Sequence, residues 1–245
     1  MDFQPSERAK KTAERVRAFI KEHIEPVEDQ HWNEILNRNN GGDWTKWTIP
    51  PRVEELKAKA RAEGLWNLFM PDPELGAGLS VLDYAFSAEE TGRSLMAPEI
   101  FNCNAPDTGN MEVLWKYGSP EQKQQWLTPL LAGEIRSVFF MTEPDVASSA
   151  APNLASTAVI EGDEIALNGK KWWSSGVGDP RCKIGIFMAA TPNPDLGRHN
   201  QHSMVLVPMD TPGVTITRML PVFGAYDEPH GLGEVHFTNV RVPVA

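Results

Sequence analysis

The chain has 245 residues, 41% of them apolar and 23% charged, so it is long enough for one large domain or two of ordinary size. Its 33 acidic residues outnumber its 23 lysines and arginines, which gives a formal net charge of -10, and no basic block interrupts the sequence. A generic nucleic-acid binder is therefore disfavoured, because phosphate binding needs clustered cations.

The first half of the chain has the periodicity of helices. Residues 6–25 place apolar side chains at helical spacing, and Pro26 is expected to end that helix. The next segment, rich in Asn, Gly and Trp, is expected to be a loop or a helical extension followed by a loop. Further helices are expected after Pro50-Pro51, from Ser80 to Gly92, over 107–117, and from Ser119 to a break or kink at Pro129.

After Gly133 the apolar pattern changes to that of strands. Strands are expected near 137–141, 154–161, 165–169, 183–190, 203–209, 213–217 and 234–240, with a turn at Glu161–Glu164. Helices followed by strands predict an α+β fold. We expect an N-terminal helical domain over residues 1–135 and a middle β-barrel or sandwich domain over residues 136–245.

The two cysteines, Cys103 and Cys182, are far apart and form no CxxC pair, so a disulfide framework is not expected. The N-terminus has no apolar signal-peptide region, and no apolar run approaches the roughly 18 residues of a membrane span. These features indicate a cytoplasmic protein. In a eukaryote the mitochondrial matrix is the alternative, although no transit peptide is visible.

Several common catalytic motifs are missing. The sequence contains no HExxH, no GxSxG, no P-loop and no complete GxGxxG. His199 and His202 lie in a polar stretch that favours a solvated loop over a metal site, so no metal is expected.

The stretch "FFMTEPDVASSA", residues 139–150, turns abruptly from apolar to small and polar. Small residues with free backbone N–H groups can form an anion-binding concavity without any cation. A surface turn that merely links two strands explains the same composition, and composition alone favours that simpler interpretation.

The stretch "NGKKWWSSG", residues 168–176, opens with a dipeptide typical of hairpin turns. Adjacent strand residues point to opposite faces, so one of Trp172 and Trp173 is expected in the core. The other tryptophan would cover a planar cofactor, a subunit interface or another domain, or would simply pack. The hydroxyls of Ser174 and Ser175 favour a heterocycle that has polar edges.

The ordered motifs "MTEPDVASS", "NGKKWWSSG" and "FTNVRVP" resemble those of the acyl-CoA dehydrogenase family, as do "PDPELGAGLSVLDYAFSAEETGRS" and "YGSPEQKQQWLTPLLAGE" in the helical half. The form "KKWWSSGVGDPRCKI" is most similar to the subgroup of family members 10 and 11. The family fold has an N-terminal helical domain, a middle β-domain and a C-terminal four-helix domain. The first two match this chain, and the third is absent from it.

The resemblance implies that FAD binds with its ring at the domain junction. Among positions that match the family's cofactor site, Phe140 and Met141 would face the flavin with their backbone, and Thr142 would donate a hydroxyl to the ring. Ser148 would serve the FAD pyrophosphate and also lie against the acyl-CoA thioester arm, with Ser149 adjacent, where many relatives carry Asp.

The second motif matches the other side of the same cofactor. Trp173 would lie beside the flavin, Ser175 would place a hydroxyl at its reactive edge, and Ser174 falls between them. Gly176 stands where relatives commonly have Asn, so the side-chain hydrogen bond of that Asn is not expected here. The resemblance places the catalytic base beyond residue 245, and neither Glu143 nor another carboxylate here is nominated as a substitute.

The implied reaction is α,β-dehydrogenation of an acyl-CoA, in which a base takes the α-proton while hydride leaves the β-carbon for the flavin. An electron-transfer flavoprotein would accept the electrons, and the intact protein would be a homo-tetramer or dimer. The alternatives are an acyl-CoA oxidase, a flavin-dependent monooxygenase, or a naturally short, non-catalytic acyl-CoA-binding protein. The 245-residue piece alone is expected to bind FAD weakly and to be inactive.

Overall fold

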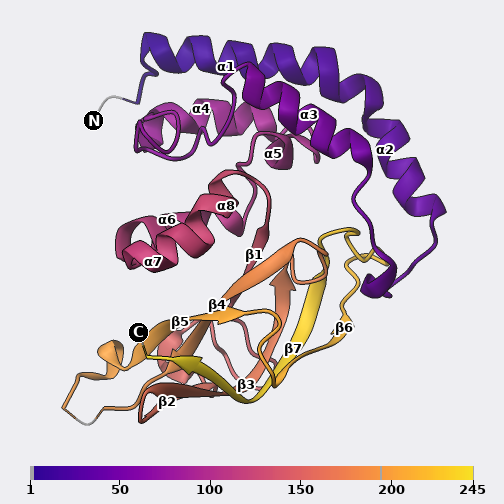
Figure 1. Ribbon diagram of the computed structural model, residues 1–245. Coiled ribbons are helices and arrows are strands. Elements are labelled where there is room, and N and C mark those ends of the chain that lie inside the picture. Colours follow the sequence, from indigo (N-terminus) through magenta and orange to yellow (C-terminus); the bar gives the residue numbers. More distant parts are fainter. Residues whose placement is uncertain (1–2, 194, 245) are drawn as a thin grey trace. The chain divides into compact units, whose positions relative to one another are not determined.

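The computed structural model describes residues 3–193 and 195–244, which form two compact units (Figure 1). The first unit is helical and contains residues 3–39 and 49–133. The second contains residues 40–48 and 134–244 and is built on a curled sheet. The expected α+β class is therefore confirmed.

Most helices of the helical unit begin and end where the capping residues predicted. Its helices are α1 (Glu7–Phe19), α2 (Glu25–Asn37), α3 (Pro51–Ala62), α4 (Val81–Thr91), α5 (Ala97–Ile100), α6 (Asp107–Tyr117), α7 (Pro120–Gln122) and α8 (Thr128–Leu131). The Ser80 hydroxyl accepts the N–H of Asp83 at the start of α4, and Ser119 forms a complete capping box with Gln122. The short helix α5 was not predicted.

Among the described residues, none of the helices combines the length and apolar character needed to span a membrane.

Pro26 does not end the first helix, so that prediction is wrong. A π-helical turn over Ile20–Ile24 joins α1 to α2, and the N–H of Glu25 bonds to the carbonyl of Ile20, five residues earlier. Proline in a regular helix lacks a donor and collides with the carbonyl four residues before it. The wider turn relieves that collision, and another such turn, Lys123–Leu127, precedes Pro129.

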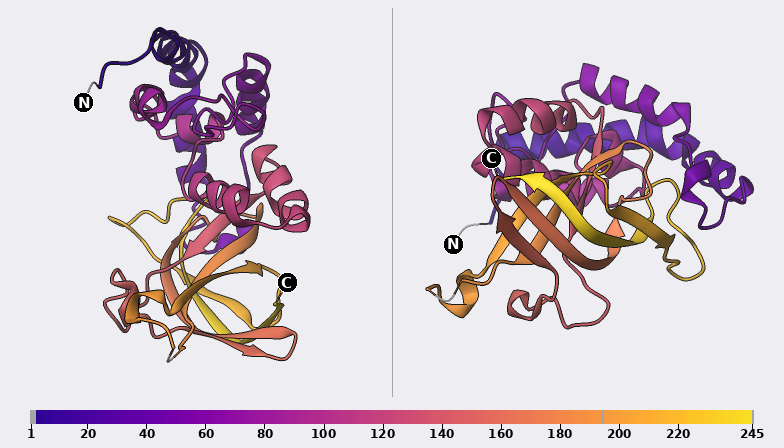
Figure 2. Two further views of the ribbon diagram at one scale, coloured as in Figure 1. Left: turned by 90° about the vertical axis from the view of Figure 1, so that its left-hand side faces the viewer. Right: turned by 60° about the horizontal axis from the view of Figure 1, so that its bottom comes forward.

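Within the described residues, the second unit is one curled sheet of seven strands (Figure 2). They are β1 (Arg136–Phe140), β2 (Thr157–Glu161), β3 (Glu164–Ser175), β4 (Cys182–Ala190), β5 (His202–Pro208), β6 (Val214–Met219) and β7 (Leu232–Pro243). The order is β1-β4-β2-β3-β7-β6, with β5 pairing to the remaining edge of β4. Strands β1 and β2 run parallel to β4, and the other pairs are antiparallel.

The segment Asn40–Thr48 lies between α2 and α3 in sequence but belongs to the sheet unit. Trp47 is buried in the core of the sheet unit, where it packs so closely on Gly178 and Gly231 that a Cβ at either glycine would collide with the indole. The Asn40 amide donates to the Glu228 carboxylate at 3.1 Å. The loop predicted here is thus a packed element of the sheet unit's core.

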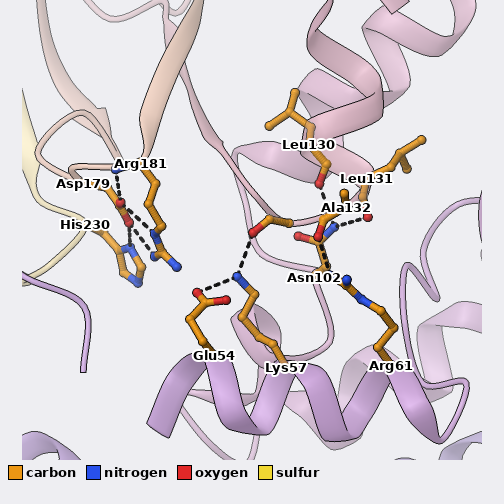
Figure 3. Close-up of polar contacts among 11 residues, drawn as sticks. Glu54, Lys57, Arg61, Asn102, Leu130, Leu131, Ala132, Asp179, Arg181 and His230 are labelled. Carbon is orange, nitrogen blue, oxygen red and sulfur yellow. Dashed lines mark hydrogen bonds and ion pairs between the residues drawn. The ribbon is translucent and has the colours of Figure 1, made fainter. Parts of the chain in front are cut away.

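Side chains of the helical unit satisfy the last carbonyls of α8 and those just after it (Figure 3). Such terminal carbonyls have no partner within their own helix. Lys57 Nζ donates to the Gly133 carbonyl at 2.9 Å, Asn102 Nδ2 to that of Leu130 at 3.0 Å, and Arg61 to that of Ala132. These contacts fix the end of the helical unit immediately before β1 begins.

Candidate functional site

Strand β3 runs through the dipeptide Asn168-Gly169, so the predicted hairpin turn there is wrong. The pairing register with β7 shifts between Leu167 and Gly169, and the Asn168 side chain accepts the N–H of Asn239 at 2.8 Å. Gly169 has a φ of 151°, and a Cβ at this position would collide with Ser156. The glycine is needed for a bulge inside the strand. The turn that connects β2 to β3 lies earlier, at Glu161–Glu164, where the sequence predicted it.

Trp172 and Trp173 lie in a second bulge of β3. Neither indole enters the core, so the prediction from strand alternation is wrong. The register shifts again between Lys171 and Ser174, and Trp173 has a left-handed φ of 51°. Trp173 is 41% exposed and Trp172 is half-buried, with ring centroids 6.0 Å apart. Lys171 occupies the inward position, with no exposed side-chain area.

The two sequence motifs lie side by side in the sheet unit. Beyond the end of β1 the chain continues along β3, where the Trp172 N–H donates to the Thr142 carbonyl at 2.9 Å. Lys171 Nζ donates to the Met141 carbonyl at 3.0 Å. Residues separated by about thirty positions in the chain therefore form one continuous surface.

Among the predicted site residues of the first motif, Phe140 and Ser148 are buried and Thr142 and Ser149 are exposed. Phe140 is fully buried and packs edge-on against Phe237, at 5.0 Å between ring centroids. The Ser148 hydroxyl accepts the N–H of Glu143 at 2.8 Å and so folds the loop back on itself.

In the second motif, the side chains of Ser174 and Ser175 have opposite environments. Ser175 is exposed, whereas Ser174 is 1% exposed and its hydroxyl has no hydrogen-bond partner in the described part of the chain. Because buried polar groups are usually paired, the Ser174 hydroxyl is an unusual feature beside Trp173. Gly176 donates its N–H to the Gly231 carbonyl at 2.9 Å, which ties the end of this motif to the loop before β7.

Beneath the first motif lies a buried ion pair that the motifs did not predict. Lys171 Nζ is 2.8 Å from Glu143 Oε1, and the side chains are 0% and 4% exposed. Burial lowers the pKa of Lys171, against the stabilising effect of Glu143. Burial tends to raise the pKa of Glu143, but hydrogen bonds from Lys171, Ser156 and Ala155 outweigh it and lower that pKa.

The sequence did contain a signal for this pair. Lys170 and Lys171 are adjacent on a predicted strand, and adjacent strand residues face opposite sides. The alternation argument applied to the tryptophans would have sent one lysine inward, where a charge needs a carboxylate partner.

Asp179 forms a second polar cluster in the sheet unit (Figure 3). Its buried carboxylate accepts from Arg181 Nη2 at 2.8 Å, and His230 Nδ1 lies 3.1 Å from it. Burial tends to raise the pKa of Asp179, but the hydrogen bonds from His230 and Arg181 lower it well below its ordinary value. The cluster joins the loop after β3 to the loop before β7.

No group of three or more His, Cys, Asp or Glu side chains in residues 3–193 and 195–244 is arranged to hold a metal ion. His199 and His202 lie at the loop before β5 and at its first residue.

Family models match both units of the chain. Residues 6–134 match the N-terminal domain of acyl-CoA dehydrogenase, and residues 138–240 match its middle domain. The mouse protein named acyl-CoA dehydrogenase family member 11 is 52% identical over 244 residues, in agreement with the expected subgroup. The match covers 99% of this chain but only 31% of the mouse protein.

Solved structures share the fold. A Mycobacterium abscessus protein whose structure is described under the acyl-CoA dehydrogenase name is 60% identical, with a TM-score of 0.91, and the match covers 98% of this chain and 60% of that one. A Mycobacterium smegmatis glutaryl-CoA dehydrogenase, crystallised in complex with FADH2, has a TM-score of 0.70 at 23% identity over 97% of this chain and 54% of its own. The chain thus spans less than two thirds of each of these proteins.

Proposed function

This chain belongs to the acyl-CoA dehydrogenase family, and on that premise we propose that the intact protein is an FAD-dependent acyl-CoA dehydrogenase. It would convert an acyl-CoA thioester to the 2-enoyl-CoA and pass electrons to an electron-transfer flavoprotein, as a step of fatty-acid β-oxidation. We further propose a cytoplasmic homo-oligomer, a dimer or a tetramer.

The observation that carries this proposal is the contact between the two motifs. The hydrogen bond from the Trp172 N–H to the Thr142 carbonyl places an exposed indole, Trp173, on the strand next to a loop of small residues and hydroxyls. Such a surface combines a π face with hydrogen-bond donors and acceptors, which suits a flavin with its polar ring edges.

The residues present fit the cofactor. The hydroxyls of Thr142 and Ser175 are exposed, and neither forms a hydrogen bond within the described part of the chain. Both are therefore available to a ligand. The unpartnered, buried hydroxyl of Ser174 lies between Trp173 and Ser175 and adds a polar group that a bound heterocycle or water could satisfy.

In the proposed reaction the bound flavin supplies the acceptor for hydride from the substrate β-carbon. Thr142 and Ser175 would orient the ring and set its polarity, and the Trp173 indole would shield one side from water. Ser148 would donate its one hydroxyl hydrogen to the pyrophosphate and lie against the thioester arm, while its oxygen accepts the Glu143 N–H. Positioning of this kind supplies much of the rate when two hydrogens must leave together.

The proposal takes the catalytic base from a part of the intact protein outside this chain. Glu143 is the buried carboxylate of the first motif, and it already bonds to Lys171 and to the N–H groups of Ala155 and Ser156. A base must be free to accept a substrate proton, so Glu143 is not suited to that task.

The test is anaerobic titration of the purified intact protein with acyl-CoA thioesters of different chain length. We expect stoichiometric bound FAD, bleaching of its visible absorbance by one or more thioesters, and the 2-enoyl-CoA as product. Trp173→Ala should weaken FAD binding at least tenfold, whereas Tyr117→Ala, an 81% exposed aromatic of the helical unit, should not. Intact protein that binds no flavin would contradict the proposal.

The same titration separates the alternatives. Rapid reoxidation of the reduced protein by air, with no need for an electron-transfer flavoprotein, would favour an acyl-CoA oxidase or a monooxygenase. Bound acyl-CoA without flavin reduction would favour a non-catalytic binding protein.

A further inference from the structure

The ammonium of Lys171 is buried directly beneath the loop that carries Thr142 and Ser148. Its three donors are all used: Nζ lies 3.0 Å from the Met141 carbonyl, 2.8 Å from Glu143 Oε1 and 2.7 Å from the Met188 carbonyl. One cation therefore joins the end of β1, the loop after it and strand β4.

Glu143 extends the network to the other side of the loop. Its carboxylate accepts the N–H groups of Ala155 at 2.8 Å and Ser156 at 3.1 Å, immediately before β2. Its own N–H donates to the Ser148 hydroxyl at 2.8 Å. Apart from the Met188 carbonyl, the groups that bond to the ion pair are thus backbone groups of the chain from Met141 to Ser156.

A buried ion pair is a poor way to gain stability, because the desolvation of two charges offsets most of their attraction. An apolar pair of similar volume would fill this space without that cost. What an apolar pair cannot do is hold backbone carbonyls and N–H groups at fixed positions. The location of the pair under the loop therefore indicates a role in setting the shape of that loop.

We propose that Glu143 and Lys171 are positioning residues that hold residues 141–148 in the conformation that receives FAD. This inference rests on the proposed function, and it adds a role for two residues that would not themselves touch the cofactor. Other hydrogen bonds of the loop are local or lie at its ends: Ser148 N–H to the Val146 carbonyl, Ala150 N–H and Asn153 Nδ2 to that of Ala147, Glu143 N–H to the Ser148 hydroxyl, and Trp172 N–H to the Thr142 carbonyl. Without the pair, the loop would sample several conformations, and the cofactor would bind only one.

The test compares single and double substitutions in the intact protein. Lys171→Met or Glu143→Gln alone leaves a buried charge or dipole without its partner, so both thermal stability and FAD affinity should fall. The double variant Glu143→Gln/Lys171→Met contains no unpaired charge, so the unfolding temperature of its apoprotein should recover most of the loss. Its FAD dissociation constant, measured by flavin fluorescence, should stay at least tenfold above wild type.

The matched control is Lys170→Met, on the opposite side of β3. Lys170 is 54% exposed and lies 3.8 Å from Asp145, a loose surface pair. This variant should keep wild-type FAD affinity and stability. A double variant with wild-type FAD affinity would overturn the positioning role, because neutral side chains of similar size would then replace the charged pair without effect.

A second readout does not need the cofactor. Amide hydrogen exchange of residues 141–149 in the apoprotein should be at least tenfold faster in the double variant than in wild type, with unchanged exchange in β6 and β7. If intact wild-type protein binds no FAD, the proposed function fails, while this measurement still decides whether the pair orders the loop. Unchanged exchange in the loop would overturn the inference.

If the double variant does not fold, Glu143→Asp provides the test. This change keeps the charge but shortens the side chain by one methylene, which draws the carboxylate away from the N–H groups of Ala155 and Ser156. We expect an FAD dissociation constant raised three- to tenfold in a folded protein. Wild-type affinity in this variant would count against the positioning role.

Discussion

His230 Nδ1 lies 3.1 Å from Oδ2 of Asp179, although the two residues are 51 positions apart. Asp179 also accepts from the side chain and the N–H of Arg181, so its carboxylate, with 0% side-chain exposure, is held by two partners. The contact connects the loop that follows Ser175 with the loop that precedes β7. Because this contact involves a carboxylate, its contribution to stability can be measured from the dependence of stability on pH.

We predict that Asp179→Asn destabilises the sheet unit. The stability of the variant should also depend less on pH in the acid range than that of wild type. The folded-state pKa of Asp179 is lowered, so its contribution is fully present above the unfolded pKa, about 3.9, and is lost as the pH falls through the folded pKa. At pH 7 the loss should be about 2 kcal/mol, the scale of hydrogen bonds to a charged group.

The measurement is the thermal midpoint of wild type and variant at several pH values from 7 to 2.5. The difference between them should persist down to pH 5 and narrow below pH 4. A difference in midpoint that grows as the pH falls would contradict the lowered folded-state pKa of Asp179. Asp195→Asn, at an exposed loop position, is the control and should leave the midpoints unchanged.

A second prediction concerns Trp47, which is 3% exposed in the core of the sheet unit. Trp47→Ala should cost roughly 3–5 kcal/mol, since it removes a large buried aromatic and leaves a cavity. The measurement is urea unfolding followed by near-ultraviolet circular dichroism, which reports aromatic packing. Tyr117→Ala, at an exposed site, should shift the midpoint little, and a small effect of Trp47→Ala would show that residues 40–48 do not belong to this core.

The sequence predicted most elements, because capping residues and apolar periods are local signals. Ser80 and Ser119 mark helix starts through contacts with their own neighbours, and the structure confirms both. The bulges at Gly169 and Trp173 were missed because they depend on strand β7 and on Ser156, which are distant in sequence. Local turn chemistry at Asn168-Gly169 was overridden by pairing on both sides of β3.

The sequence predicted some residues of the candidate site and missed others, for the same reason. Motif positions such as Thr142 and Ser175 came from a resemblance, and their role in binding stays a prediction. The ion pair beneath them was missed because its partners are 28 positions apart and both lie inside the fold. Trp47 was likewise missed, since nothing in a polar loop between two helices indicates packing in the core of a sheet that follows about ninety residues later.

A third prediction concerns the thiol of Cys103. Burial raises the pKa of Cys103 to about 11, and its Sγ donates to the Phe101 carbonyl at 3.3 Å. Because the thiolate is the reactive form, a disulfide reagent at pH 8 should modify Cys103 only as fast as the protein opens. A Cys182→Ser background isolates this thiol, and a reaction in the folded protein at the rate of a free thiol would contradict the prediction.

The last prediction concerns Lys57 at the end of the helical unit. Its side chain is 3% exposed and its ammonium donates to the Gly133 carbonyl and to Glu54, each at 2.9 Å. Lys57→Met keeps the length and removes the donor, so the Gly133 carbonyl loses this bond, at a cost of about 1–3 kcal/mol. The measurement is the urea midpoint followed by far-ultraviolet circular dichroism. Lys59→Met, at an exposed position of the same helix, should change stability by less than about 0.5 kcal/mol, and equal effects of the two variants would show that the contact with Gly133 contributes nothing.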